Sequence, residues 1–247
     1  MNQSDIEVGL YHLGVRPGMM LEVHSSLRSF GYVEGGAAAV IRALRNIVGA
    51  EGAIVMPSFR LSRKLPLTTE DIALGITLKI KYLGDEETST DMGVIADTFR
   101  QMPGVIKGEG RFQVCAWGKD AELHAREGFQ RVIDAGGYAL LLGVNIYRLS
   151  AMHYVEDAMP ADIKARFAPN EEMLACYPKD QWFIESFEPA TKPWYEIQTR
   201  AHEAGMIQDG MVGDSRCMFF QVKPVVELYR EALLTRPYDL YGLEKVV

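Results

Sequence analysis

A strand, a loop, a helix and a second strand follow one another near the N-terminus, and this order constrains the fold more than any other feature. Met20–His24 and Ala53–Met56 are short, mainly apolar segments of the kind that form buried strands. The helix between them ends at Gly49, and one apolar face is formed by Val40, Ile41, Leu44, Ile47 and Val48. A helix that joins two consecutive strands makes a βαβ unit, which favours a parallel sheet.

The remaining elements extend this pattern over the chain. Strands are predicted at Val114–Trp117, Tyr138–Leu142 and Arg216–Gln221. One helix is predicted to begin at a Ser4/Glu7 capping box and to end near Gly14, and a second to follow a cap at Asp91. Three more are predicted: one that begins near Ser150, one over Trp194–Ala204, and a final one that begins at Pro224. We expect one α/β domain over residues 1–247, with a central, largely parallel or mixed sheet flanked by helices. Residues 61–90 are less regular and are expected to form an excursion from this core.

Composition excludes several classes of function. No apolar run approaches the roughly 18 residues that a membrane helix needs, and no signal peptide is visible, so we expect a cytoplasmic protein that does not bind membranes. The net charge of −7, without a basic stretch, argues against nucleic acid and suits a cationic small molecule. The three cysteines form no C-x-x-C pair, so we expect no disulfide framework and no metal site.

A serine-containing loop after the first strand is a candidate ligand site. Ser25 and Ser26 follow the strand, and Gly35-Gly36 leads into the next helix. A loop at the carboxyl end of a parallel strand offers free amides and hydroxyls to phosphates or to a pantetheine amide. The alternative is a surface turn rich in serine and glycine.

His153 and Glu156 are the strongest candidates for acid–base chemistry. Three residues apart on a predicted helix, they lie next to one another on its surface, and a carboxylate beside an imidazole fixes its tautomer and raises its basicity. The alternative is a surface His/Glu pair without a chemical role. His24 is the competing base, although orienting the serine loop suits its position better, and the remaining histidines (His12, His124 and His202) are weaker candidates.

Several segments, in the same order, resemble the aminoglycoside 3-N-acetyltransferase family. The most specific is the loop His24–Ala37, with the sequence HSSLRSFGYVEGGA. The later ones are Val55–Phe59, Thr88–Gly93 leading to Phe99-Arg100, Leu141–Val144, Met152–Glu156, and more loosely Gly210–Phe219. The likeness therefore extends over nearly the whole chain.

The resemblance implies an α/β fold distinct from that of the GCN5-related acetyltransferases, and transfer of acetyl from acetyl-CoA, a co-substrate, with no permanently bound cofactor. It implies that His153 deprotonates the amine and Glu156 orients His153 or contacts the acceptor. The residues implied to contact CoA are His24, Ser25, Ser26, Leu27, Met92 and Gly93. Those implied to contact the acceptor, beside the excursion, are Asp91, Tyr147 and Asp157. A homodimer is compatible with this resemblance.

The sequence departs from the family pattern in two places near the expected site. Glu109–Gly118 lacks the His-Pro pair and the serine that the family usually has there. Before His153, the family's Asp and Thr-Ser pair are replaced by Tyr147 and by Ser150-Ala151. Both departures lie around the expected site, so they bear on the acceptor more than on the reaction type. The resemblance favours an aminoglycoside-like acceptor, as in antibiotic resistance, and a different small amine is the alternative. Two further alternatives are a non-catalytic CoA-binding module and a thiol-dependent acyltransferase that uses Cys115.

Overall fold

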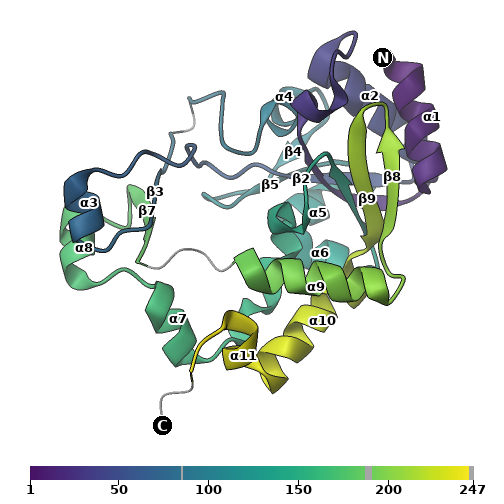
Figure 1. Ribbon diagram of the computed structural model, residues 1–247. Helices are drawn as coiled ribbons and strands as arrows, with labels where there is room; N and C mark the ends of the chain where they lie inside the picture. The colour runs from purple at the N-terminus through teal and green to yellow at the C-terminus, as the bar shows by residue number, and fades with distance from the viewer. Residues whose placement is uncertain (85, 187–190, 245–247) are drawn as a thin grey trace.

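A seven-stranded sheet forms the centre of the computed structural model, which describes residues 1–84, 86–186 and 191–244 (Figure 1). Its strand order is β4-β5-β2-β1-β6-β9-β8. The strands are β1 (Met20–Ser25), β2 (Ala53–Pro57), β4 (Ile106–Lys107), β5 (Val114–Gly118), β6 (Tyr138–Leu142), β8 (Gln208–Val212) and β9 (Ser215–Gln221). The strands predicted from apolar segments are thus present, each to within one or two residues.

The sheet is mixed, with a parallel centre. β1 pairs in parallel with β2 on one side and with β6 on the other, whereas the outer strands pair antiparallel. The predicted βαβ unit is formed by β1, α2 (Gly36–Val48) and β2, and Gly49 ends the helix as expected. Parallel pairing aligns Ser25 with Leu142, so β1 and β6 end at the same edge of the sheet.

Both faces of the sheet are buried under helices. Along β6, Leu140 and Leu142 pack with α1 (Gln3–Leu13), α2 and α4 (Val94–Gln101). Ala139 and Leu141 pack on the other face. There they meet the 3₁₀ helix η3 (Ser150–Ala158), α5 (Ala121–Glu127), α6 (Phe129–Asp134), α9 (Thr191–Glu203) and α10 (Val222–Thr235). Because strands covered on both faces need apolar residues throughout, β1, β2 and β6 appear in the sequence as nearly unbroken apolar runs.

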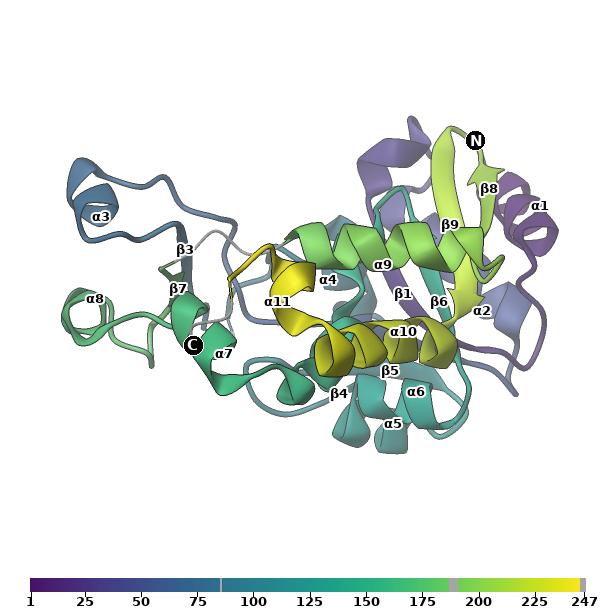
Figure 2. The same ribbon diagram turned by 60° about the horizontal axis from the view of Figure 1, so that its bottom comes forward.

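A small subdomain projects to one side of the sheet (Figure 2). It contains α3 (Thr69–Ala73), β3 (Leu78–Lys81), α8 (Glu171–Cys176) and β7 (Trp182–Glu185), and α7 (Ala161–Phe167) leads into it. β3 pairs antiparallel with β7, and Ile76, Met173 and Ile184 form a small core between them. The excursion expected from residues 61–90 therefore has a second half, from a later part of the chain.

Several predicted helix ends are wrong. Asn2 and Asp5 form the capping box of α1, because the Asn2 side chain accepts from the Asp5 amide at 3.0 Å and the Asp5 carboxylate accepts from the Asn2 amide at 2.8 Å. Ser4 and Glu7 do not form it. The N-cap of α4 is Gly93, so Asp91 is not its cap.

Two further points concern the helices near the C-terminal half. The helix that carries His153 begins at Ser150 as predicted, and it is a 3₁₀ helix. Pro224 lies in the first turn of α10, but the short helix α11 (Pro237–Tyr241) comes later. In the described part of the chain, no helix is long and apolar enough to cross a bilayer.

Candidate active site

Two loops that carry the predicted functional residues leave the sheet side by side. The serine loop follows β1 and contains a short 3₁₀ helix, η1 (Leu27–Phe30), while the segment leading to η3 follows β6. The Ser26 amide donates to the Leu142 carbonyl at 2.9 Å, which continues the β1–β6 pairing into the loops. Because the carboxyl ends of adjacent parallel strands meet at one edge, this edge is where an α/β sheet binds ligands.

The serine loop is held in place by its own hydroxyls. Ser29 Oγ donates to the Ser26 carbonyl at 2.7 Å and lies 2.7 Å from the buried Ser215 Oγ. Gly143, with a positive φ of 68°, allows this arrangement, since a Cβ there would lie 1.8 Å from Ser29 Oγ. These bonds anchor the start of the loop to β9, while Arg28 and Tyr32 further along it are exposed.

The predicted CoA contacts come from two segments that meet. A Cβ at Gly93 would lie 3.7 Å from the Ser25 carbonyl oxygen, so the start of α4 lies against the serine loop. Leu27 and Met92 both pack on the hydrophobic core beneath. Gly93, with a φ of 91°, has no side chain to cap the first amides of α4, and such amides attract anions. Ser25, Ser26, Met92 and Gly93 thus form one surface at the edge of the sheet.

His153 and Glu156 form the pair expected from their spacing. A 3₁₀ helix has three residues per turn, so the two side chains lie directly above one another, with His153 Nδ1 2.9 Å from Glu156 Oε2. The His153 side chain is 60% exposed, and its ring packs against Trp194 at 4.8 Å between centroids. A carboxylate accepts a hydrogen bond from Nδ1–H, so the neutral ring keeps the lone pair on Nε2, where it can remove a proton.

Glu156 is held in turn by the buried Tyr229, which is paired with the half-buried Tyr241. Tyr229 Oη donates to Glu156 Oε1 at 3.4 Å and lies 2.6 Å from Tyr241 Oη. Burial, foremost, and the Glu156 charge raise the pKa of Tyr229, which therefore stays protonated and remains a donor. Each oxygen of Glu156 thus has a partner, and the carboxylate is fixed beside the imidazole.

Glu185 joins this site from the small subdomain and was missed by the sequence analysis. It ends β7, and burial raises the pKa of its carboxyl to about 7. The charges of Lys64 and His153 act in the opposite direction, and Glu156 adds to the rise. These couplings place Glu185 within electrostatic reach of His153 and Glu156. No motif surrounds Glu185, so only the β3–β7 pairing could have revealed it.

The three residues expected to contact the acceptor differ in their surroundings. Tyr147 is half-buried beside Trp194, and its pKa is raised by burial first and also by Glu185 and Asp91, against the effect of Arg148. Asp91 pairs with Arg148 at 3.1 Å.

The third, Asp157, has a side chain that is 78% exposed and lies 4.0 Å from Arg230. It follows Glu156 by one position, so it lies on a different face of η3 from the His153–Glu156 pair. Tyr147 and His153 both pack against Trp194, and Asp91 is joined to the residue after Tyr147, whereas Asp157 is turned from the His153–Glu156 pair.

The two rival nucleophile or base candidates are both buried. His24 is 6% exposed, and its partners are Glu22 and the Ser150 amide, not the serine loop that it was expected to orient. Cys115 is 1% exposed on β5, and burial, foremost, raises the pKa of its thiol. A buried thiol with a raised pKa is a poor nucleophile.

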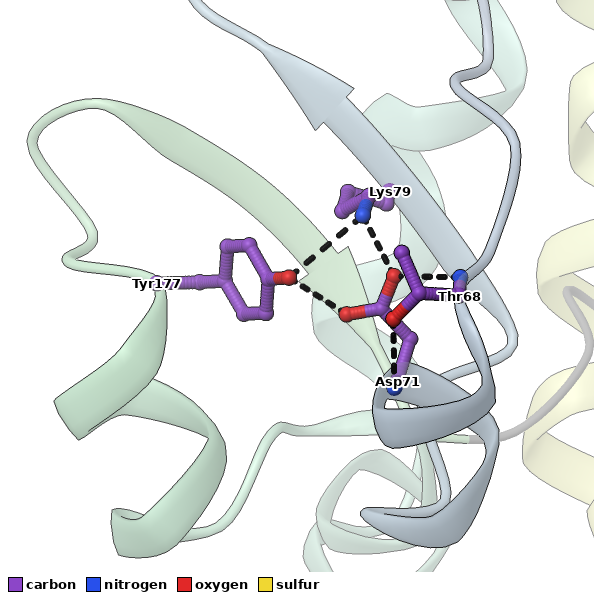
Figure 3. A network of polar contacts seen from close by, with 4 residues as sticks. All are labelled: Thr68, Asp71, Lys79 and Tyr177. Carbon is purple, nitrogen blue, oxygen red and sulfur yellow. Dashed lines mark hydrogen bonds and ion pairs between the residues drawn. The ribbon is translucent and has the colours of Figure 1, made fainter.

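A polar network holds the two halves of the small subdomain together (Figure 3). Asp71 accepts from Lys79 and from the Tyr177 hydroxyl, and Asp71 and Thr68 cap α3 reciprocally. Burial of Asp71 opposes its ionisation, but the hydrogen bonds from Lys79, the Thr68 amide and Tyr177 prevail and lower the carboxyl pKa to about 2. Because Lys79 is on β3 and Tyr177 precedes β7, this network supports the strand that carries Glu185.

Residues 23–234 match the family model described as aminoglycoside 3-N-acetyltransferase. Aminoglycoside N(3)-acetyltransferase III from Salmonella sp is 31% identical over 257 residues, which cover 91% of this chain and 88% of that protein. Two solved structures have a similar fold. The apoenzyme of aminoglycoside acetyltransferase AAC(3)-IVa has a TM-score of 0.72 and 23% identity, and the match covers 97% of this chain and 91% of that one. AAC-IIIb in a binary complex with CoASH has a TM-score of 0.70 and 17% identity, and the match covers 96% of this chain and 97% of that one.

Proposed function

This chain belongs to the aminoglycoside 3-N-acetyltransferase family, and from that premise we propose that it transfers an acetyl group from acetyl-CoA to an amino group of an aminoglycoside. The observation that carries the proposal is the His153–Glu156 pair, oriented and accessible, beside the serine loop at one edge of the sheet.

In the proposed reaction, His153 acts as the general base. An ammonium group is not nucleophilic, so Nε2 takes a proton from the amine as the amine nitrogen attacks the thioester carbonyl carbon. The carbon–sulfur bond then breaks, and CoA leaves as a thiolate that takes up a proton. Glu156 keeps Nδ1 protonated and stabilises the imidazolium, since its carboxylate is held by Tyr229.

Acetyl-CoA is proposed to lie over the serine loop and the start of α4. The half-buried hydroxyls of Ser25 and Ser26 and the first amides of α4 after Gly93 suit the pantetheine and phosphate groups, because small residues let a ligand approach the backbone closely. Leu27 is a predicted contact as well. His24, also predicted to contact CoA, is buried and bonded to Glu22 and Ser150, so we place it beneath the donor surface and not against the ligand.

The acceptor is proposed to bind between η3 and the small subdomain. Glu156, Glu185 and Asp91 supply carboxylates for a polycation, and Tyr147 and Trp194 supply apolar surface. This arrangement suits an aminoglycoside, which carries several ammonium groups on a sugar frame. A homodimer and a cytoplasmic location remain predictions, which sedimentation and cell fractionation would test.

The test is the kinetics of His153→Ala with acetyl-CoA and a panel of aminoglycosides. General-base assistance contributes about 10²–10⁴-fold, so kcat should fall at least about 100-fold while CoA affinity stays nearly unchanged. Glu156→Gln should give a smaller loss. His202→Ala is the matched control, since His202 pairs with Asp209 on another part of the surface, and it should retain full activity.

Two results would contradict the proposal. If His153→Ala kept most of its activity, the base would be another group. If the wild-type protein bound CoA but released none from acetyl-CoA with any amine in the panel, the alternative of a non-catalytic CoA-binding module would hold.

A further inference from the structure

A glutamate lies inside the sheet, beneath the helix that carries His153. Glu22 is in β1, the middle strand of seven, and is 0% exposed. Its Oε1 accepts from the Ala151 amide at 3.1 Å and lies 2.8 Å from His24 Nε2. Its Oε2 is buried and has no hydrogen-bond partner within residues 1–84, 86–186 and 191–244. A carboxylate in such a place is costly, so its retention calls for a physical reason.

His24 binds the same helix one residue earlier. Its Nε2 lies 3.3 Å from the Ser150 amide, and its ring packs on Phe129 at 5.9 Å between centroids. Phe129 in turn packs against Tyr154 and donates its amide to the Tyr154 hydroxyl at 3.2 Å. The pair of Glu22 and His24 thus meets η3 at its first two residues, and Phe129 meets it again at Tyr154, its fifth residue.

These contacts fix the start of the helix. The first amides of any helix lack partners within it, and in η3 the Ser150 amide donates to His24 Nε2 and the Ala151 amide to Glu22 Oε1. His153 follows two residues later, so a shift of this anchor moves the imidazole directly. β1 is rigid because it is paired on both sides, and it therefore offers a fixed reference for the base.

Stability alone does not account for the pair. Replacing a buried polar pair by apolar residues of similar size is often neutral or stabilising, whereas removing one partner is strongly destabilising. We propose that Glu22 and His24 are positioning residues, which hold the start of η3 so that His153 meets the acceptor amine. This inference rests on the proposed function of His153.

Four variants test the proposal: Glu22→Leu, His24→Phe, the double variant Glu22→Leu/His24→Phe, and Glu22→Gln. Each single apolar change leaves a buried polar group without its partner, so both should lower the melting temperature. The double variant removes both side-chain polar groups but leaves the Ser150 and Ala151 amides without acceptors, so it should recover only part of that loss. Its kcat should nevertheless stay at least tenfold below wild type, since small displacements of reacting groups slow the reaction strongly.

The ratio of kinetic constants separates positioning from other roles. In the double variant, the KM for acetyl-CoA should stay within about twofold of wild type while kcat falls. Glu22→Gln keeps an oxygen that accepts from the Ala151 amide, so it should restore kcat to within about threefold of wild type. Val23→Ala, on the opposite face of the same strand, is the matched control: it should lose stability and keep kcat.

The outcomes distinguish this inference from the function on which it rests. A double variant with partly recovered melting temperature and wild-type kcat would overturn the positioning role. A raised KM for acetyl-CoA with unchanged kcat would also overturn it and assign His24 to the donor site. If His153→Ala itself proved active, the proposed function would fail first, whatever the Glu22 variants showed.

Discussion

Glu185 makes the stability of this protein depend on pH in a way that one substitution should remove. Its carboxyl has a pKa of about 7 in the folded chain, against an ordinary value of 4.5. Below pH 4.5 the group is protonated in both states. Between pH 4.5 and 7 only the unfolded chain ionises, so the free energy of unfolding falls as the pH rises, and above pH 7 the loss is complete. The full loss is about 3 kcal/mol.

The assay is urea denaturation of wild type and Glu185→Gln at pH 5, 6, 7 and 8. Glutamine has no charge to bury, so the variant should gain on wild type as the pH rises, by up to about 3 kcal/mol at pH 8. Glu172→Gln, an exposed carboxylate on α8, is the control and should follow wild type. Parallel curves for wild type and Glu185→Gln over this range would refute the argument.

The same carboxyl links acceptor binding to pH. A bound ammonium group beside Glu185 favours its ionised form, which is about one-tenth populated at pH 6 and about nine-tenths at pH 8 for a pKa near 7. Acceptor affinity in wild type should therefore strengthen across this range relative to Glu185→Gln. Measuring both proteins with one acceptor cancels the titration of the acceptor's own amines.

Two further predictions concern the donor loop and the small subdomain. Replacing Ser25 and Ser26 together by bulky residues should weaken CoA binding at least tenfold by calorimetry without unfolding the protein, and wild-type affinity in a folded variant would contradict the donor assignment. Asp71→Asn leaves the buried Lys79 without its counter-charge and should destabilise the subdomain by about 3 kcal/mol. In wild type, this contribution is present above about pH 4 and is lost as the pH falls towards 2, because the pKa of Asp71 is lowered to about 2. An unchanged urea midpoint for Asp71→Asn would contradict the predicted destabilisation.

The sheet was predictable from the sequence because its central strands are buried on both faces. Such strands leave continuous apolar runs, and the amphipathic helix between β1 and β2 completes a local signal. The capping box of α1 was misplaced because Ser4/Glu7 and Asn2/Asp5 both fit a capping pattern, and only the side-chain bonds decide between them.

The small subdomain could not be derived in this way. Its strands have four residues each, too few to show a period, and they pair across about a hundred residues of chain: the Thr77 amide donates to the Glu185 carbonyl. By contrast, His153 and Glu156 are only three residues apart, so their spacing alone predicted that they form a pair. Glu185 and Glu22 reach that pair only through tertiary structure, and no spacing in the sequence indicates it.

The site thus draws on two parts of unequal rigidity, and this division has a consequence for specificity. The donor surface and the base rest on β1 and β6, inside large hydrophobic cores. Glu185 rests on a two-stranded sheet beside a small core cluster of Ile76, Met173 and Ile184, stabilised by the Asp71–Lys79–Tyr177 network. Local openings occur where few apolar contacts hold the structure, so the acceptor side should open more readily than the donor side.

Changes in the subdomain should therefore alter the KM for the acceptor with little effect on the KM for acetyl-CoA. Asp71→Asn, assayed at a temperature where the sheet stays folded, should show this split, and an equal rise of both constants would mean that the two parts open together.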